Sequence, residues 1–152
     1  MYKLKTPQAP LALTTTSIIP FVASAGAMYV WRGDTALQQT AGLWLIVYGA
    51  VVMSFLGGVR WGAEMTRRDK PRFGELLSSI FGVLIGWTLV IAYFQWRPDK
   101  ILFLAMAAAL VLHYVLDVMS GEMPIWYRRL RVWPTLGAVL SLAVAYWLFG
   151  RA

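Results

Sequence analysis

Long apolar runs alternate with short polar clusters along the whole of this chain. Each of five runs has about the 17–25 residues that a helix needs to cross the hydrocarbon layer of a bilayer. The runs cover approximately residues 13–31, 37–61, 76–94, 101–120 and 133–149. The pattern predicts an all-α fold, a polytopic bundle of five transmembrane helices. With no linker and no convincing internal repeat, residues 1–152 are predicted to form a single integral membrane domain.

The polar clusters between the runs predict the loops of this bundle. Residues 65–75 and residues 121–132 read as the two charged loops. Pro134 would then stand in the first turn of the fifth helix, where the missing N–H of proline costs nothing.

The composition agrees with a membrane protein and excludes several other classes. Hydrophobic residues make up 59% of the chain and charged residues only 14%, with a mean hydropathy of +0.61. The net charge of +7 is spread over the polar clusters and forms no basic stripe with stacking aromatics, so the expected partners are membrane lipids and not nucleic acid. The absence of cysteine from the sequence excludes disulfides, thiolate catalysis and cysteine-based zinc or iron–sulfur sites.

The first apolar run allows two interpretations. Lys3 and Lys5 before an apolar run, with Ala23-Ser24-Ala25 within it, resemble a signal peptide and its cleavage site. Pro20 is nevertheless compatible with a retained helix, because a membrane helix tolerates proline where hydroxyls or neighbouring helices satisfy the freed carbonyl. We predict that the run is retained as a helix.

Lysine and arginine are distributed unevenly between alternate polar clusters. Ten of the 14 fall in the N-terminal segment and in the clusters that follow the second and fourth runs, and four fall in the others. Cytoplasmic loops of membrane proteins carry the excess of basic residues. The N-terminus is therefore predicted to face the cytoplasm and the C-terminus to face away from it.

Ionisable residues within the runs gather on this predicted cytoplasmic side. Arg60 and Glu64 are four positions apart, as are His113 and Asp117, so each pair shares a helix face. Asp117 lies within the hydrocarbon, where an unpaired carboxylate costs several kcal/mol or takes up a proton. It therefore needs a cation. The arginines on the same side are Arg60, Arg128 and Arg131.

This polar cluster has a structural and a functional interpretation. It could be a charge latch that fixes helix register, or a polar pocket that binds a headgroup, a quinone or a small solute, or that relays protons. Haem would need a second axial ligand besides His113, and one histidine with a few carboxylates makes a poor zinc site. No nucleophile–base motif is present, so we expect no cofactor, no metal site and no enzymatic activity.

Small residues form ridges that would allow close helix packing in lipid. They are Gly57, Gly58 and Gly62 in the second run, Gly82 and Gly86 in the third, and Gly137 with Ser141 and Ala145 in the fifth. The third-run ridge lies between Phe81 and Trp87 and has no strongly polar neighbour. We predict that this ridge, or that of the fifth run, packs against another membrane protein or a second copy; the alternative is that both are used inside the monomer.

The string from Ser54 to Gly62 resembles the hallmark of the family named domain of unknown function 3429. Further stretches resemble its other motifs: Ile19-Pro20-Phe21, Asp117, and Pro124-x-Trp126-Tyr127-x-x-Leu130-Arg131. The resemblance covers nearly the whole chain. It implies a helical membrane protein, here of the bacterial cytoplasmic (inner) membrane, and it implies no activity.

Two functional hypotheses follow. The first is a non-enzymatic accessory or assembly protein that recognises another membrane component. The second is a small transporter or binding protein that uses the polar cluster. A cavity reaching Asp117 would favour the second, and a packed core with an exposed ridge of small residues would favour the first.

Overall fold

The computed structural model describes residues 8–96, 98–119 and 123–150, and these residues form helices without any strand. The helices are α1 (Gln8–Thr16), α2 (Ile19–Val30), α3 (Thr35–Arg67), α4 (Phe73–Gln95), α5 (Ile101–Met119) and α6 (Ile125–Leu148). Five stretches are long and apolar enough to span a membrane, with α1 and α2 together forming the first. The predicted all-α bundle with five spans is confirmed.

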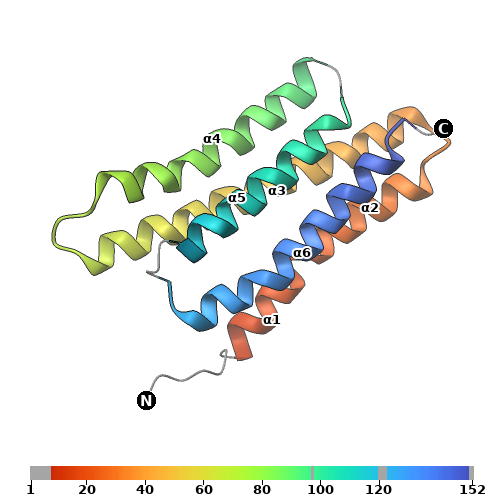
Figure 1. Cartoon of the computed structure of the whole chain (residues 1–152). Coiled ribbons are helices and arrows are strands. Elements are labelled where there is room, and N and C mark those ends of the chain that lie inside the picture. Colours follow the sequence, from red (N-terminus) through yellow and green to blue (C-terminus); the bar gives the residue numbers. More distant parts are fainter. Residues whose placement is uncertain (1–7, 97, 120–122, 151–152) are drawn as a thin grey trace.

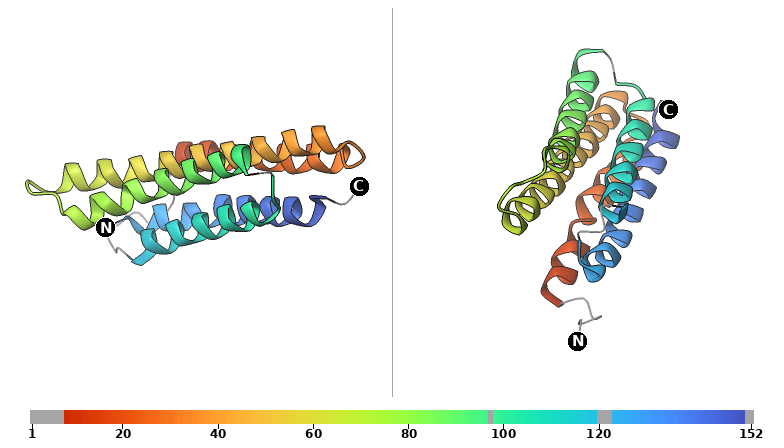
Figure 2. Two further views of the ribbon diagram at one scale, coloured as in Figure 1. Left: turned by 90° about the horizontal axis from the view of Figure 1, so that it is seen from above. Right: turned by 60° about the vertical axis from the view of Figure 1, so that its left-hand side comes forward.

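Helices α2 to α6 form a ring in which each packs against two neighbours, and α1 packs on α6. Going round, α4 packs on α3, α3 on α2, α2 on α6, α6 on α5, and α5 again on α4. Helix α5 also touches α3 across the ring, whereas α3 and α6 barely meet. Figure 1 shows α3 and α4 running side by side as a long hairpin, and Figure 2 shows α5 and α6 in a second layer beneath it.

Two predicted helix boundaries are wrong. Helix α3 continues to Arg67, which leaves only a short turn before α4, and α6 begins at Ile125, not near residue 133. Pro134 therefore lies inside α6 and not in its first turn. The predicted loop at 121–132 is helical from Ile125 onwards. Its arginines can belong to a helix because the apolar part of an arginine side chain packs against neighbouring helices while the guanidinium finds polar partners.

The first span is interrupted between α1 and α2. Pro20 follows the break. It has no N–H to continue the helical hydrogen bonds, and its ring would clash with the carbonyl of residue 16 in a continuous helix. The break frees backbone carbonyls, and the hydroxyl of Tyr48 on α3 donates to the carbonyl oxygen of Ser17 at 2.9 Å. Side chains from a neighbouring helix thus complete the backbone bonding that the proline interrupts.

The two ends of the bundle differ in chemistry. At one end, Gln38 of α3 donates to the carbonyl of Leu148 and accepts from the N–H of Gly150. The ring of Phe103 at this end packs edge to face on the rings of Tyr93 and Phe149. We call the other end the basic end: α3 and α5 finish there, α4 and α6 begin there, and it includes the turn 68–72. The candidate site lies at the basic end.

Candidate functional site

Asp117 is the centre of the basic end. It lies in the last turn of α5 and is only 1% exposed. Its Oδ1 accepts from Nη1 of Arg60 on α3 at 3.0 Å, and its Oδ2 accepts from Nη1 of Arg131 on α6. The expected pairing of Asp117 with an arginine is confirmed, with two arginines in place of one.

Arg60 continues the network to α4. Its Nη2 donates to Oε2 of Glu75 and to Oγ of Ser78, each at 2.9 Å. Glu75 was missed in the sequence because it fell in a predicted loop; it lies in the first turn of α4, where a carboxylate also suits the helix dipole. One guanidinium therefore connects α3 with both α4 and α5.

Glu64 shares the face of α3 with Arg60 but has a separate task. It is buried, and its Oε1 accepts from the backbone N–H of Arg72 at 2.7 Å. The same oxygen lies 3.6 Å from Nε of Arg68 and 3.7 Å from Nε of Arg72. Glu64 thus holds the turn between α3 and α4, and its Oε2 has no hydrogen-bond partner among the described residues.

His113 and Arg128 lie beside the network and do not extend it. The Nδ1 of His113 is 3.9 Å from Oδ2 of Asp117, too far for a hydrogen bond, and the ring packs on Gly82 of α4. Arg128 donates from Nη1 to the carbonyl of Val118 at 3.3 Å. Arg128 therefore binds an orphan carbonyl at the end of α5, a favourable place for a cation, instead of Asp117.

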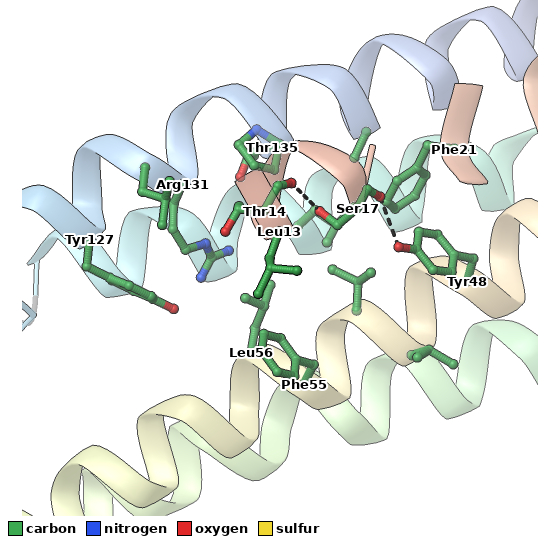
Figure 3. A pocket seen from close by; sticks show the side chains of 16 residues that line it. Leu13, Thr14, Ser17, Phe21, Tyr48, Phe55, Leu56, Tyr127, Arg131 and Thr135 are labelled. Atoms are coloured by element: carbon green, nitrogen blue, oxygen red, sulfur yellow. Dashed lines mark hydrogen bonds between the residues drawn. The ribbon is translucent and has the colours of Figure 1, made fainter. Parts of the chain in front are cut away.

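A cleft opens beside the network, between α1, α3 and α6. Its volume is about 350 Å³, and its walls are mainly apolar side chains such as Val51, Phe55 and Leu130. Arg131 and Tyr127 line it towards the basic end, and Figure 3 shows the side chains of both directed into it. The hydroxyl of Tyr127 is buried beside the guanidinium of Arg131, and its O–H has no acceptor among the described residues. The sequence did not reveal this cleft, since its walls come from helices whose packing cannot be read from the chain.

The predicted glycine ridges divide into those that pack and those that do not. A Cβ on Gly57 would collide with the backbone carbonyl of Ser79, and one on Gly86 would lie 2.9 Å from Cα of Ala50, so these glycines let α3 and α4 approach closely. Gly58 and Gly62 are exposed on α3 with open space beside them. No helix of the described chain packs against them, so their predicted role in close helix packing is not met inside this bundle.

The ridges of the third and fifth runs are used inside the chain. Gly82 faces His113 and Met53, Gly86 faces Ala50, and Gly137 faces Ile18. These glycines therefore pack inside the chain, and a membrane-protein partner or a second copy bound through them, as predicted, has no support from their contacts. The alternative held, because the broken first span and the α3–α4 hairpin supply side chains that reach these small residues.

Comparison with known proteins gives a family for this chain. The model of a family described as protein of unknown function (DUF3429) matches residues 6–147. The chain belongs to the DUF3429 family. This family member is 30% identical to transmembrane protein 69 of Mus musculus over 148 residues. It is 32% identical to transmembrane protein 69 of Xenopus tropicalis over 141 residues. These alignments cover 94% and 90% of the chain but 57% and 53% of the relatives, so the chain spans a little over half their length.

No solved structure matches the chain. The family, the names of its relatives and the five apolar helices establish an integral membrane protein with a helical bundle. The family carries no assigned activity, so any function must be argued from the site itself.

Proposed function

We propose that this DUF3429 protein is a non-catalytic, membrane-embedded binding protein that takes an amphiphilic molecule in the cleft between α1, α3 and α6. One observation carries the proposal: the apolar walls of the cleft end at the polar groups of Arg131 and Tyr127. Ligand sites are commonly apolar clefts with a few convergent polar groups and volumes of about 300–1,000 Å³. The cleft, at about 350 Å³, has both properties.

The long axis of the cleft suits a molecule that is itself oriented by the bilayer. Its lining on α6 runs from Tyr127 to Ala138. At 1.5 Å per residue this is roughly 16 Å of helix, from near the end of the bundle towards the middle of the membrane. A polar head at Arg131 and an apolar chain directed inward would therefore follow the orientation of the surrounding lipid.

The charge latch and the binding cleft are parts of one arrangement under this proposal. Asp117 holds the guanidinium of Arg131, and Arg60 holds Asp117. Since Arg60 also bonds to Glu75, the polar end of the cleft is tied to α3, α4, α5 and α6 together. Such support from several helices keeps a binding group in one orientation.

The alternative role, an accessory or assembly protein, stays a prediction. The ridges of the third and fifth runs pack inside the chain, whereas Gly58 and Gly62 form an exposed ridge on α3 that would favour this role. The feature expected to favour the binding hypothesis was a cavity reaching Asp117. The cleft reaches Arg131, the bonded partner of Asp117, and Asp117 itself does not line it.

We propose further that the basic end faces the cytoplasm, in a bacterial inner membrane. The uneven distribution of the 14 lysines and arginines supports this orientation. A reporter that is active only outside the cytoplasm should be active when fused after Ala152, and a cytoplasmic reporter should be active when fused after Lys70. Activity of the outside reporter after Lys70 would reverse the assigned orientation.

Two valines on α3 provide the test of the cleft. Val51 lines it and Val47, one turn earlier, does not, although both are exposed. Val51→Trp should fill the cleft, whereas Val47→Trp should only add a ring to the lipid-facing surface. We expect an amphiphile to co-purify with the wild type and with Val47→Trp, and to be lost from Val51→Trp, when organic extracts of the purified proteins are compared by mass spectrometry.

The thermal unfolding midpoints of both variants serve as the folding control. Equal retention of the amphiphile by both tryptophan variants, or its absence from all three proteins, would contradict the proposal.

A further inference from the structure

Resting on the proposed function, we infer the class of molecule that the cleft takes: an amphiphile whose head is uncharged and presents carbonyl-type acceptor oxygens to Arg131 and Tyr127. The inference depends on how the charge of Arg131 is balanced and on which hydrogen-bond donors face the cleft. Both follow from contacts at the basic end.

The positive charge of Arg131 is already compensated within the protein. Arg60, Arg131, Asp117 and Glu75 form one connected set through the bonds of the two guanidinium groups. Two arginines and two carboxylates balance one another within these bonds, and Glu75 also lies 3.7 Å from Nη2 of Arg72, which belongs to the turn and does not line the cleft. Of the charged residues in the set, Arg131 is the one that lines the cleft, so the cleft offers a charged group without an excess of charge.

An anionic head would meet a carboxylate as well as the arginine. Any oxygen close enough to accept from Arg131 also lies near Asp117, because Oδ2 of Asp117 is bonded to the same guanidinium. Like charges repel strongly where the surroundings are apolar and the dielectric is low. A phosphate or carboxylate would therefore have to displace Asp117 from Arg131, whereas a neutral acceptor would not.

Hydrogen-bond donors remain available at this end of the cleft. A guanidinium carries five N–H donors, and the bond to Asp117 uses one, on Nη1. The buried hydroxyl of Tyr127 lies beside the guanidinium of Arg131, which can only donate to it, so its own O–H has no acceptor among the described residues. A buried donor left in this way costs free energy. A carbonyl oxygen has two lone pairs and can accept from Arg131 and from Tyr127 at once.

Two kinds of membrane amphiphile present such oxygens on an apolar chain: the ester carbonyls of glycerolipids and the ring carbonyls of quinones. Three probes separate the head charge from the head chemistry. Dioleoylglycerol and dioleoylphosphatidic acid share their chains and ester carbonyls and differ in the phosphate. Decylubiquinone supplies uncharged ring carbonyls on a single chain.

The experiment titrates each probe into the full chain, in an alkyl maltoside that itself has no ester groups, and reads the bound fraction by native mass spectrometry. We expect at least one uncharged probe to bind about tenfold more tightly than phosphatidic acid. Tyr127→Phe should weaken that probe by about fivefold to tenfold, which is the effect of losing one neutral hydrogen bond. Tyr29→Phe is the matched control, because Tyr29 is an exposed hydroxyl near the end of α2 and does not line the cleft.

The outcomes distinguish the ligand class from the site. Tighter binding of phosphatidic acid that is lost in Val51→Trp would overturn the uncharged head and leave the cleft as the binding site. Binding of every probe unchanged by Val51→Trp would overturn the cleft itself. Failure of both uncharged probes to bind, or equal binding by Tyr127→Phe and the wild type, would also overturn the inference. The stronger of the two uncharged probes identifies the ester or the quinone as the source.

Discussion

The two sides of α3 show how one helix can make both a closed and an open interface. On the side towards α4, Gly57 lies against the backbone of Ser79, and Ala50 lies against Gly86, so the two helices meet almost backbone to backbone. On the side towards α1 and α6, larger side chains such as Phe55 and Leu56 keep the helices apart and line the cleft. Figure 1 shows this contrast as a tight α3–α4 hairpin beside a wider separation of α3 from α6.

The difference shows that residue size decides helix separation in this bundle. Lipid and leucine are equally apolar, so helices in a membrane gain little from burying apolar surface and associate through close contact instead. The side of α3 with small residues achieves that contact. The side with large residues does not, and an interface that leaves space between helices is the natural place for a ligand.

Removing Asp117 should lower the free energy of unfolding more than any other change, because this carboxylate pairs with Arg60 on α3 and with Arg131 on α6. Asp117→Leu leaves Arg131 beside the cleft, and Arg60 beside α4, without their shared partner. Breaking a buried ion pair by removing one member costs about 3–5 kcal/mol. The free energy of unfolding, followed by helix content as dodecyl sulfate is added to mild detergent, should fall by about that amount.

The double variant Asp117→Leu with Arg131→Leu is the control for this prediction. It removes the orphaned charge at the cleft, while Arg60 keeps Glu75 and Ser78. The double variant should be less damaging than the sum of the two single variants. If the effects simply add, the ion pair between Asp117 and Arg131 is not the source of the loss.

Adjacent glycines on α3 should respond in opposite directions to alanine. Gly57→Ala places a methyl group against the backbone carbonyl of Ser79, and such overpacking costs about 1–3 kcal/mol. Gly58→Ala meets open space and should stabilise the helix by roughly 0.5–1 kcal/mol, since alanine is the better helix former. The same unfolding titration measures both. Equal shifts for the two variants would show that the close contact of α3 with α4 does not depend on Gly57.

Loosening α1 on the open side should have the smallest and most local effect. Helix α1 has no buried residue. The hydroxyl of Tyr48 donates a hydrogen bond to the carbonyl of Ser17, directly after the end of α1. Tyr48→Phe removes that bond, worth about 1 kcal/mol. Amide hydrogen exchange in residues 14–18 should rise about fivefold, with little change in the global unfolding midpoint. Tyr29→Phe should leave this exchange unchanged, and an equal rise in both variants would rule out the bond to Ser17 as the cause.

The sequence predicted the spans well because length and hydropathy alone determine whether a helix can cross a bilayer. It also predicted that Asp117 would be paired, because an ionised carboxylate within lipid must find a cation. It could not choose between the candidate arginines. Arg131 reaches Asp117 from within α6, which starts earlier than Pro134 suggested, since proline is tolerated inside a helix that has neighbours to support it.

Other parts of the site depend on distances that a sequence does not contain. Glu75 pairs with Arg60 because the turn 68–72 is short enough to bring the first turn of α4 beside α3. Gly58 and Gly62 follow the same small-residue spacing as Gly82 and Gly86, yet one ridge faces outward and the other inward. Spacing identifies a ridge, but the packing of the other helices decides whether anything lies against it.

The arrangement of the charges also has a consequence for how the chain enters the membrane during synthesis. The α3–α4 hairpin carries the Arg60–Glu75 pair, and the α5–α6 hairpin carries the Asp117–Arg131 pair. Each hairpin can therefore enter the membrane with its buried charge accompanied by an oppositely charged partner from the same hairpin. The bond from Arg60 to Asp117, 57 positions apart, joins the two hairpins, so it can form only when they associate in the lipid.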